Sequence, residues 1–183
     1  MDGFTLFDTP IGRCGLAWRG DGVITAVQLP EPDDARTAAR LLRAAPEGTV
    51  QAEPPAWVAQ AMVRIVGALN GAPDDLSDLP LDMTGVPPFH QRVYAIARAI
   101  PPGRTMTYGE VAAALNEPGA ARAVGQALGH NPFAPVVPCH RVLAAGSRGG
   151  GFSASGGVDT KLRMLLAERA RFGNEPGLFD AAP

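Results

Sequence analysis

The feature that most constrains the fold of this chain is a change in its hydrophobic pattern near residue 85. Before that point, short apolar segments alternate with turns that contain Gly and Pro, which is typical of an antiparallel meander of strands. After it, apolar residues recur at helical spacing. A chain of 183 residues is long enough for two small domains, each with its own core. We therefore predict an α/β N-terminal domain over residues 1–85, a mostly helical domain over 86–173 and a tail over 174–183.

The same pattern locates the individual elements. Strands are expected over residues 4–7, 14–18 and 23–29. Thr107 and Glu110 have the spacing of a capping box, so a short helix is expected from there through residue 115. The stretch 72–80, with two prolines and three aspartates, predicts either a linker or a last edge strand. The other predicted helices span residues 34–44, 56–69, 89–100, 120–128 and 158–170.

Composition narrows the class of protein. No stretch approaches the roughly 20 uninterrupted apolar residues that a membrane span needs, and Asp2 and Asp8 stand where a signal peptide would carry basic residues. We therefore expect a cytoplasmic protein with no membrane partner. Cys14 and Cys139 match no metal-ligand spacing, so neither a disulfide nor a metal site is expected, and a reactive thiol would be free to act.

The net charge of −2 hides an asymmetry between the two halves. Residues 1–85 hold six arginines against twelve acidic residues, whereas residues 86–173 hold nine arginines and one lysine against four acidic residues. A basic half beside an acidic half suggests that one part meets a polyanion while the other does not. An accidental division of solvated charges would give the same numbers, so the pattern alone leaves both interpretations open.

The two short helices that begin at Thr107 and near residue 120 have the form of a helix-turn-helix unit. The second helix is unusual, because Arg122 is its only charge and the residues around it are small. Such a helix can pack tightly against its neighbour, which the residues alone favour, or it can enter a narrow groove. The small residues are Gly119, Ala120, Ala121, Ala123 and Gly125.

Cys139 lies in the segment 131–142, which carries the clearest chemical signal. Three prolines and a pair of valines favour an extended backbone, so we expect the cysteine on a stiff, extended segment. Only a thiolate is a competent nucleophile, and a free cysteine is mostly protonated at neutral pH. Cys139 therefore needs a base or a positive environment.

His140 is the nearest candidate base. Adjacent side chains of an extended strand point to opposite faces, so His140 can serve Cys139 only if the backbone turns there or a water bridges the two groups. Asp159 and Glu168 are the acids that could orient the histidine. For an isolated Cys-His pair, a buried structural thiol remains the simpler interpretation.

Taken together, these residues resemble the active-site signature of the O6-alkylguanine-DNA alkyltransferases, also called methylated-DNA-protein-cysteine methyltransferases. The resemblance rests on residues 138–142, preceded by Asn131-Pro132 and by residues 122–125, and it extends in consistent order over 89–168. The opening meander, with residues 9–12, looks like the N-terminal domain of that family. The resemblance implies a ribonuclease-H-like α/β domain followed by a winged-helix-like domain with a helix-turn-helix.

The resemblance also implies the chemistry. The alkyl group of O6-alkylguanine, with O4-alkylthymine as a second candidate substrate, would be transferred to Cys139, and the protein would be consumed in this single event. His140 would act as the base through a water, Glu168 would orient the histidine, Asn131 would brace the turn, and Tyr108 would approach the flipped base. No cofactor is implied.

Double-stranded DNA that contains the lesion is the implied partner, bound by a monomer. In this family the second helix of the helix-turn-helix enters the minor groove, and the damaged nucleotide is rotated out of the duplex. Arg122 would fill the space of the extruded nucleotide, and the small face of its helix would fit the groove. The residues assigned to DNA are Arg122, Tyr108, Ala121, Ala123, Gly125 and Arg141.

The glycine-rich segment 149–157 would cover the base pocket. The sequence departs here from the commonest form of the family, in which a tyrosine and a serine stand directly before a pair of glycines. The serine that contacts the guanine O6 is therefore either Ser153 or Ser155. The residues assigned to the substrate pocket are Val142, Ser153, Ser155 and Gly156.

Three other functions are considered. A non-catalytic lesion binder of the alkyltransferase-like type would lack the acceptor cysteine, which this chain has at position 139. A cysteine hydrolase could use Cys139, His140 and Glu168, but nothing in the sequence suggests an acyl site. A combined repair protein and transcription factor would need a further metal-binding domain with several cysteines, whereas this sequence has two.

Overall fold

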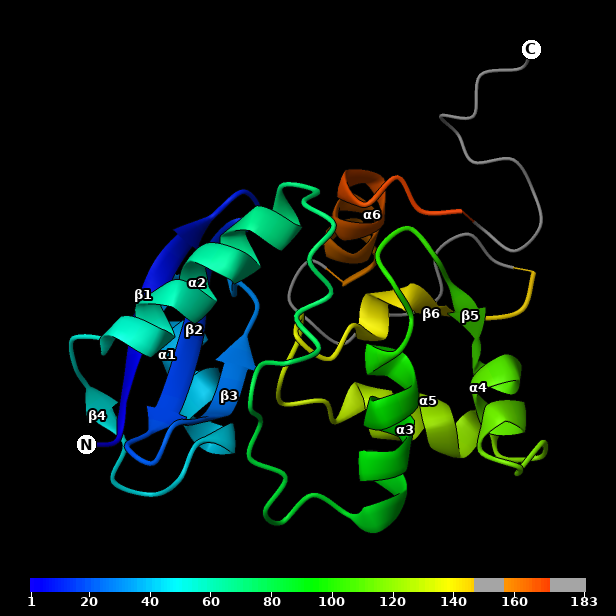
Figure 1. The fold of residues 1–183 in the computed structure, drawn as a ribbon, viewed down its shortest axis with the longest axis horizontal. Coiled ribbons are helices and arrows are strands. Elements are labelled where there is room, and N and C mark those ends of the chain that lie inside the picture. The colour runs from blue at the N-terminus through cyan, green and yellow to red at the C-terminus, as the bar shows by residue number, and fades with distance from the viewer. Residues whose placement is uncertain (147–156, 172–183) are drawn as a thin grey trace.

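The computed structural model describes residues 1–146 and 157–171, and it has a mixed α/β fold in two parts that lie side by side (Figure 1). The first part holds a four-stranded sheet with two helices, and the second holds short helices around the segment that carries Cys139. No helix in these residues is long and apolar enough to cross a membrane. The helices and the one 3-10 turn are α1 Asp34–Ala44, α2 Ala56–Leu69, α3 Pro88–Arg98, α4 Tyr108–Ala114, α5 Ala121–Gly129, η1 Cys139–Arg141 and α6 Gly157–Ala167. The strands are β1 Gly3–Thr9, β2 Gly12–Arg19, β3 Val23–Gln28, β4 Val50–Gln51, β5 Met106–Thr107 and β6 Val142–Leu143.

The larger sheet has the order β3-β2-β1-β4, in which β1, β2 and β3 form the antiparallel meander and β4 pairs parallel with β1. The first hairpin closes at Gly12, whose φ of +120° is a conformation that residues with a Cβ rarely adopt. Thr9 stabilises the turn, since its hydroxyl donates to the Gly12 carbonyl at 2.6 Å.

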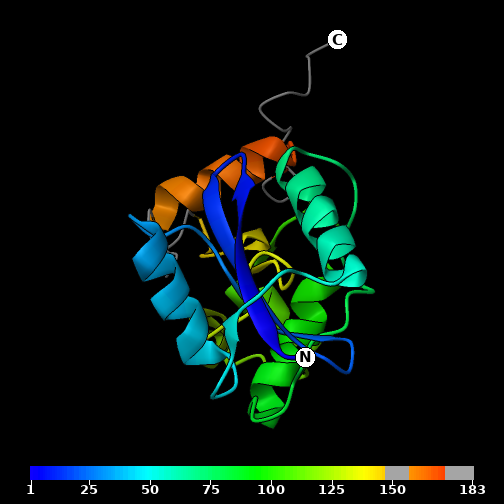
Figure 2. The ribbon, with the colours of Figure 1, turned by 90° about the vertical axis from the view of Figure 1, so that its left-hand side faces the viewer.

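Helices cover both faces of this sheet (Figure 2). On one face Leu16 and Trp18 of β2 pack with α2, and on the other face Ala17 packs with Leu41 of α1. Successive residues of a strand point to opposite faces, so a strand covered on both sides must be apolar throughout. This explains why residues 14–18 form a continuous apolar run instead of an alternating one.

The outer edge of β3 is covered by two distant segments. The Ile24 N–H donates to the Pro80 carbonyl at 2.8 Å, and the Val27 N–H donates to the Pro132 carbonyl at 2.9 Å. Residues 72–80 form no strand, so they connect the two parts as a linker, and Leu81 makes a single parallel bridge with Ile24. The segment that leads to Cys139 is thus attached by a backbone hydrogen bond to the sheet of the first part.

The second part has a hydrophobic core of its own, built from α3, α4, α5 and the segment 133–142. The Tyr94 hydroxyl of α3 donates to the Ala127 carbonyl of α5 at 2.8 Å. The predicted capping box is confirmed: the Glu110 N–H donates to the Thr107 hydroxyl at 3.1 Å, and the Thr107 N–H donates to the Glu110 carboxylate at 2.7 Å. This cap fixes the start of α4 and therefore the position of Tyr108, its first residue.

The sequence predicts the longer elements well and the short ones poorly. The three strands are confirmed, the bounds of α1 and α2 agree with the prediction, and α3, α5 and α6 differ from it by one to three residues at their ends. The expectation that Cys139 lies on an extended backbone is wrong, because residues 139–141 form a 3-10 turn. The two-residue strands β4, β5 and β6 were not predicted, since two residues carry no detectable periodicity.

Glycines allow the end of α6 to approach two loops closely. Gly71 has a φ of +92°, and a Cβ at this position would lie 2.5 Å from the Ala167 carbonyl oxygen. Gly103 has a φ of +86°, and its Cβ would lie 3.2 Å from the Glu168 carbonyl oxygen. These contacts fix the end of α6, and with it the direction in which Glu168 points.

We predict that Gly71→Ala lowers the free energy of unfolding by about 2–4 kcal/mol, because a left-handed backbone and a steric clash both oppose the new methyl group. Gly48→Ala is the matched control, since Gly48 also has a positive φ, of +83°, but has nothing within 4 Å of the added Cβ. The free energy of unfolding of Gly48→Ala should fall only by the cost of the left-handed backbone, about 1–2 kcal/mol. Denaturant unfolding of both variants tests this, and equal losses would show that the approach of α6 to Gly71 is unimportant.

Candidate functional site

Cys139 is the first residue of the 3-10 turn η1, between the proline-rich segment and the short strand β6. Its side chain is buried, with 7% of the residue exposed. The Arg141 N–H donates to the Pro138 carbonyl at 2.9 Å and closes the turn. In a 3-10 turn successive side chains are about 120° apart, so Cys139 and His140 do not point to opposite faces as they would in a strand.

Asn131 holds this turn from the side. Its amide nitrogen donates to the Val137 carbonyl at 2.8 Å, and its amide oxygen accepts from the Phe133 N–H at 2.9 Å. The same side chain also lowers the pKa of the Cys139 thiol. One amide therefore acts on both the backbone before the cysteine and the sulfur itself.

The surroundings of the Cys139 sulfur act in opposite directions on its ionisation. Burial raises the pKa of the thiol, whereas the hydrogen bond from Asn131, the charge of Lys161 and two backbone N–H groups lower it. The net effect is a raised pKa, so the thiol is protonated in the free protein. Groups that would stabilise a thiolate are nevertheless in place around it.

His140 is almost fully buried, with 2% of the residue exposed, and its two ring nitrogens have different surroundings. Nε2 lies 2.7 Å from the Glu168 carboxylate. Nδ1 is buried and has no hydrogen-bond partner among the described residues. Burial lowers the pKa of His140 and outweighs the opposing effect of Glu168, so the ring is neutral at neutral pH. If Nε2–H donates to Glu168, Nδ1 is left as a free acceptor, which is what a base requires.

Glu168 connects His140 with Arg141. The Arg141 guanidinium donates to the Glu168 carboxylate from Nε and Nη2, at 2.8 to 3.2 Å, and from Nη1 to the Ile100 carbonyl at 2.7 Å. Burial alone would raise the pKa of Glu168, but the hydrogen bonds and charges of His140 and Arg141 lower it to about 2. Glu168 is therefore a carboxylate at every physiological pH. Asp159, the other candidate acid, is exposed.

Lys161 is a residue near Cys139 that the sequence reasoning missed. It is fully buried in α6, and its ammonium group donates to the Val142 carbonyl at 2.8 Å. Burial lowers its pKa, and the thiolate form of Cys139 opposes that shift. The sequence held a signal, because Lys161 is on the apolar stripe of α6 with Met164 and Leu165, three and four residues further on.

Tyr108 and Arg122 lie on the two helices that pack beside this turn. Tyr108 is half-buried at the start of α4, and its pKa is raised by burial and then by the charge of Cys139, so the phenol is protonated. Gly125 of α5 packs against the Tyr108 ring, since a Cβ there would lie 3.8 Å from it. Arg122 is exposed near the start of the same helix.

The structure brings most of the predicted site residues together, with clear exceptions. Cys139, His140, Glu168, Asn131 and Tyr108 gather around the turn η1. Arg141 is 4% exposed and bound to Glu168, so its charge is directed into the protein and not toward a DNA phosphate. Val142 is fully buried beside the turn. Ser153, Ser155 and Gly156 lie outside the described residues.

The arrangement provides a nucleophile, a neutral base oriented by a carboxylate, and a phenol that can donate a proton. Each is buried or half-buried, which strengthens the electrostatic interactions between them. An exposed arginine on a neighbouring helix adds a cation at the surface. Within residues 1–146 and 157–171, no three His, Cys, Asp or Glu side chains form a group that could hold a metal ion.

Comparison with known proteins by sequence and by structure points to one family. Residues 88–170 match the family model described as the DNA-binding domain of 6-O-methylguanine DNA methyltransferase. A methylated-DNA--protein-cysteine methyltransferase from Mycolicibacterium paratuberculosis is 38% identical over 173 residues, which cover 94% of this chain and 96% of the relative.

Two crystal structures from Mycobacterium tuberculosis resemble this fold. OGT in complex with DNA has a TM-score of 0.73 at 34% identity, covering 91% of this chain and 92% of that chain. The O6-methylguanine methyltransferase has a TM-score of 0.72 at 35% identity, covering 96% of this chain and 97% of that chain. The similarity therefore extends over both parts of the fold.

We predict that Lys161→Met slows alkylation of Cys139 by iodoacetamide about tenfold at neutral pH, because loss of a nearby buried cation raises the pKa of the thiol. Burial raises the pKa of Cys14 to about 12, so Cys14 should not react under the same conditions. Arg163→Met is the matched control, since it removes one charge from the exposed side of the same helix. An unchanged rate in Lys161→Met, with folding verified by thermal melting, would contradict an electrostatic role for Lys161.

Proposed function

The chain belongs to the family of methylated-DNA--protein-cysteine methyltransferases, and we propose that it repairs DNA by transferring the alkyl group of O6-alkylguanine in a duplex to its own Cys139. The observation that carries this proposal is the buried Cys139 turn, in which a neutral His140 has one nitrogen bound to Glu168 and the other without a hydrogen-bond partner in the described part of the chain. O4-alkylthymine is a second candidate substrate.

The acceptor thiol must lose its proton before it attacks. In the proposed reaction a water bridges Cys139 and Nδ1 of His140, and the proton passes through it to the imidazole. Glu168, ionised and bound to Nε2, stabilises the imidazolium that forms. Asn131 and Lys161 stabilise the thiolate, and Lys161 is an addition to the residues expected from sequence.

One substitution step then follows. The Cys139 sulfur forms a bond to the alkyl carbon as the bond from that carbon to the guanine O6 breaks, and the electron pair of the broken bond stays on the guanine. The Tyr108 phenol stays protonated because its pKa is raised, so it can donate a hydrogen bond to the departing base. The product is a thioether on Cys139 and a restored guanine in the DNA, so each chain reacts once.

The DNA contacts belong to the same proposal. Minor-groove entry of α5 would use its small residues Ala121, Ala123 and Gly125, and Arg122 would occupy the place of the flipped nucleotide. Arg141 is better explained as a positioning residue for Glu168 than as a DNA contact, given its burial. Val142 would line the base pocket, and Ser153, Ser155 and Gly156 would cover it.

The finer structural expectations remain proposals as well. We propose that residues 1–85 form a ribonuclease-H-like scaffold domain, that residues 86–173 form a winged-helix-like domain that binds DNA and accepts the alkyl group, and that residues 174–183 are a tail. The protein would act as a monomer and without a cofactor. We also propose that it acts in the cytoplasm.

A non-catalytic lesion binder is the alternative, and Cys139 argues against it. A buried structural thiol would need no hydrogen bond from Asn131 and no adjacent buried cation. The base and its carboxylate would also have no purpose in a protein that only binds.

We predict that a duplex containing O6-methylguanine adds one methyl group to the peptide that bears Cys139, at one equivalent per chain. Mass spectrometry of the intact protein and of its peptides measures this. Cys139→Ala should bind the lesion but show no transfer, whereas Cys14→Ala should transfer normally. Transfer by Cys139→Ala, or a methyl group on another residue of the wild-type protein, would contradict the assignment of the acceptor.

We also predict that Arg122→Ala slows transfer from duplex DNA about 10²-fold, since nothing then fills the gap left by the flipped nucleotide and the few kcal/mol for unstacking are no longer offset. Transfer from the free base O6-methylguanine should be unchanged, because that substrate needs no flipping. Arg163→Ala, with the same loss of charge on α6, is the control. Equal losses on both substrates would exclude the proposed role of Arg122.

A further inference from the structure

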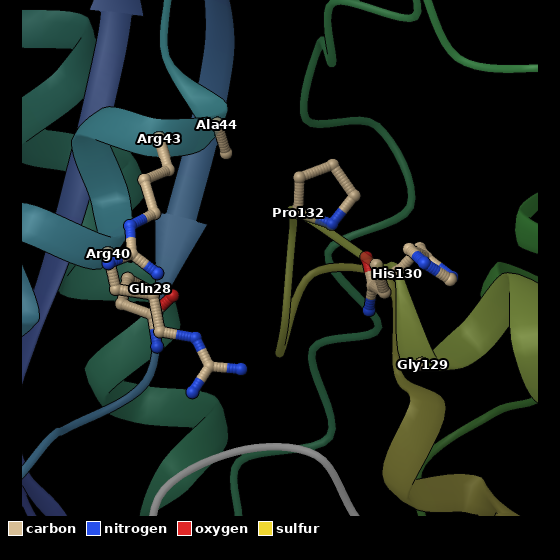
Figure 3. A pocket seen from close by; sticks show the side chains of 8 residues that line it. Gln28, Arg40, Arg43, Ala44, Gly129, His130 and Pro132 are labelled. Atoms are coloured by element: carbon tan, nitrogen blue, oxygen red, sulfur yellow. The ribbon is translucent and has the colours of Figure 1, made fainter.

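A cavity of about 330 Å³ lies between the two parts of the fold, outside the Cys139 turn. Figure 3 shows Arg40 and Arg43 of α1 and Gln28 of β3 on one side of it, and His130 and Pro132 on the other. The cavity is large enough for a phosphodiester group with part of its sugar. Of the residues that line it, the proposed transfer uses only Asn131, and the predicted DNA contacts use none.

The charge that borders this cavity is positive. Arg40 and Arg43 are three residues apart, hence on the same side of α1, and both are exposed. Arg40 forms an ion pair with Glu31 at 2.7 Å, whereas Arg43 has no ion pair or hydrogen bond from its side chain to any residue in the described part of the chain. Among the described residues, no carboxylate lines the cavity. The ring of His130 is turned away from the two arginines (Figure 3), and its Nδ1 lies 2.7 Å from the Gln126 carbonyl.

The cavity adjoins the helix that would enter the DNA. Gly129, the last residue of α5, lines it, and Arg122 is seven residues earlier, which is about 10 Å along the helix axis. A phosphate backbone borders the minor groove on each side, and a duplex carries about one charge per 1.7 Å of its axis. A duplex that holds α5 in its minor groove must therefore present phosphates near the end of α5.

We propose that this cavity binds a backbone phosphate of the DNA, with Arg43 as the principal contact and Arg40 beside it. The inference rests on the proposed function, because it takes the minor-groove position of α5 as its premise. Arginine suits this role, since its planar guanidinium can donate two parallel hydrogen bonds to a phosphate. The acidic N-terminal half would then take part in DNA binding through α1.

The cavity also adjoins Asn131, the residue that holds the Cys139 turn from the side. Asn131 lines the cavity, donates to the Val137 carbonyl and lowers the pKa of the Cys139 thiol. A phosphate seated there would lie beside the residue that positions the nucleophile. DNA would thus be held on two sides of the turn, at Arg122 and at Arg43.

The test measures the affinity of Arg43→Ala for a duplex as a function of salt concentration. Loss of one phosphate contact should reduce the slope of log K against log salt by about one, for damaged and undamaged DNA alike. When the salt concentration rises fourfold, the affinity of the variant for the duplex should therefore fall about threefold less than the affinity of the wild type. Arg43→Lys should retain most of the slope. Arg13→Ala is the control, because Arg13 is near the other end of α1, where it pairs with Asp34, and its loss changes the net charge equally.

Three outcomes would overturn the inference. The first is an unchanged slope in Arg43→Ala, whether or not its melting temperature falls. The arginines would then only complement the partial negative charge at the C-terminal ends of α1 and α5. The second is an equal change in Arg13→Ala. The third is that Arg43→Ala weakens binding of inorganic phosphate or a mononucleotide but leaves the salt slope of DNA binding unchanged. The ligand of the cavity would then be a free phosphate.

The proposed function is tested separately by the methyl group on Cys139. If the wild-type protein transfers methyl and the slope of Arg43→Ala is unchanged, the inference fails and the function stands. If the slope changes and no transfer occurs, the phosphate site stands and the function fails.

Discussion

The carboxylate of Glu168 is the group on which the geometry of the candidate site depends. It receives hydrogen bonds from Arg141 and lies 2.7 Å from Nε2 of His140, in a place where an unpaired charge would cost several kcal/mol. Removing one partner of such a buried pair costs roughly 3–5 kcal/mol, so the three side chains form a unit. This unit fixes the orientation of the imidazole and leaves Nδ1 as the nitrogen that can act on a substrate or a water.

Glu168 reaches this position because several parts of the chain converge on it. Gly71 and Gly103 let two loops approach the end of α6 more closely than a residue with a Cβ could. The Ile100 carbonyl holds Arg141 from the other side, and Pro132 attaches the acceptor segment to the edge of β3. The N-terminal sheet therefore contributes to the site without placing a side chain in it. This is a physical reason for the two parts to remain together.

The sequence predicts those features of the site that are local. A capping box, three strands and the longer helices each depend on residues within a few positions of one another, and their patterns are visible in the sequence. The 3-10 turn at Cys139 was missed because the prolines before it favour an extended chain, whereas the turn is held by Asn131 and by contacts from α6. The assignment of Arg141 to DNA rests on the family resemblance, and only the fold shows that Glu168 neutralises its charge. The buried position of Lys161 is visible in the sequence, because a lysine on the apolar stripe of a helix is unusual.

The packing around the sulfur also explains why the proposed reaction would occur once. Cys139 is 7% exposed and lies in a hydrophobic core with Val137 and Val142, so an added alkyl group must displace its neighbours, at a typical cost of 1–3 kcal/mol. A thioether is neutral, so it keeps none of the charge that Lys161 and the backbone N–H groups stabilise in the thiolate. Hydrolysis would need a water, deprotonated by His140, to attack the alkyl carbon and displace the Cys139 thiolate. Burial raises the pKa of that thiol, which makes the thiolate a poor leaving group. The features that place the thiol for attack thus also oppose its regeneration.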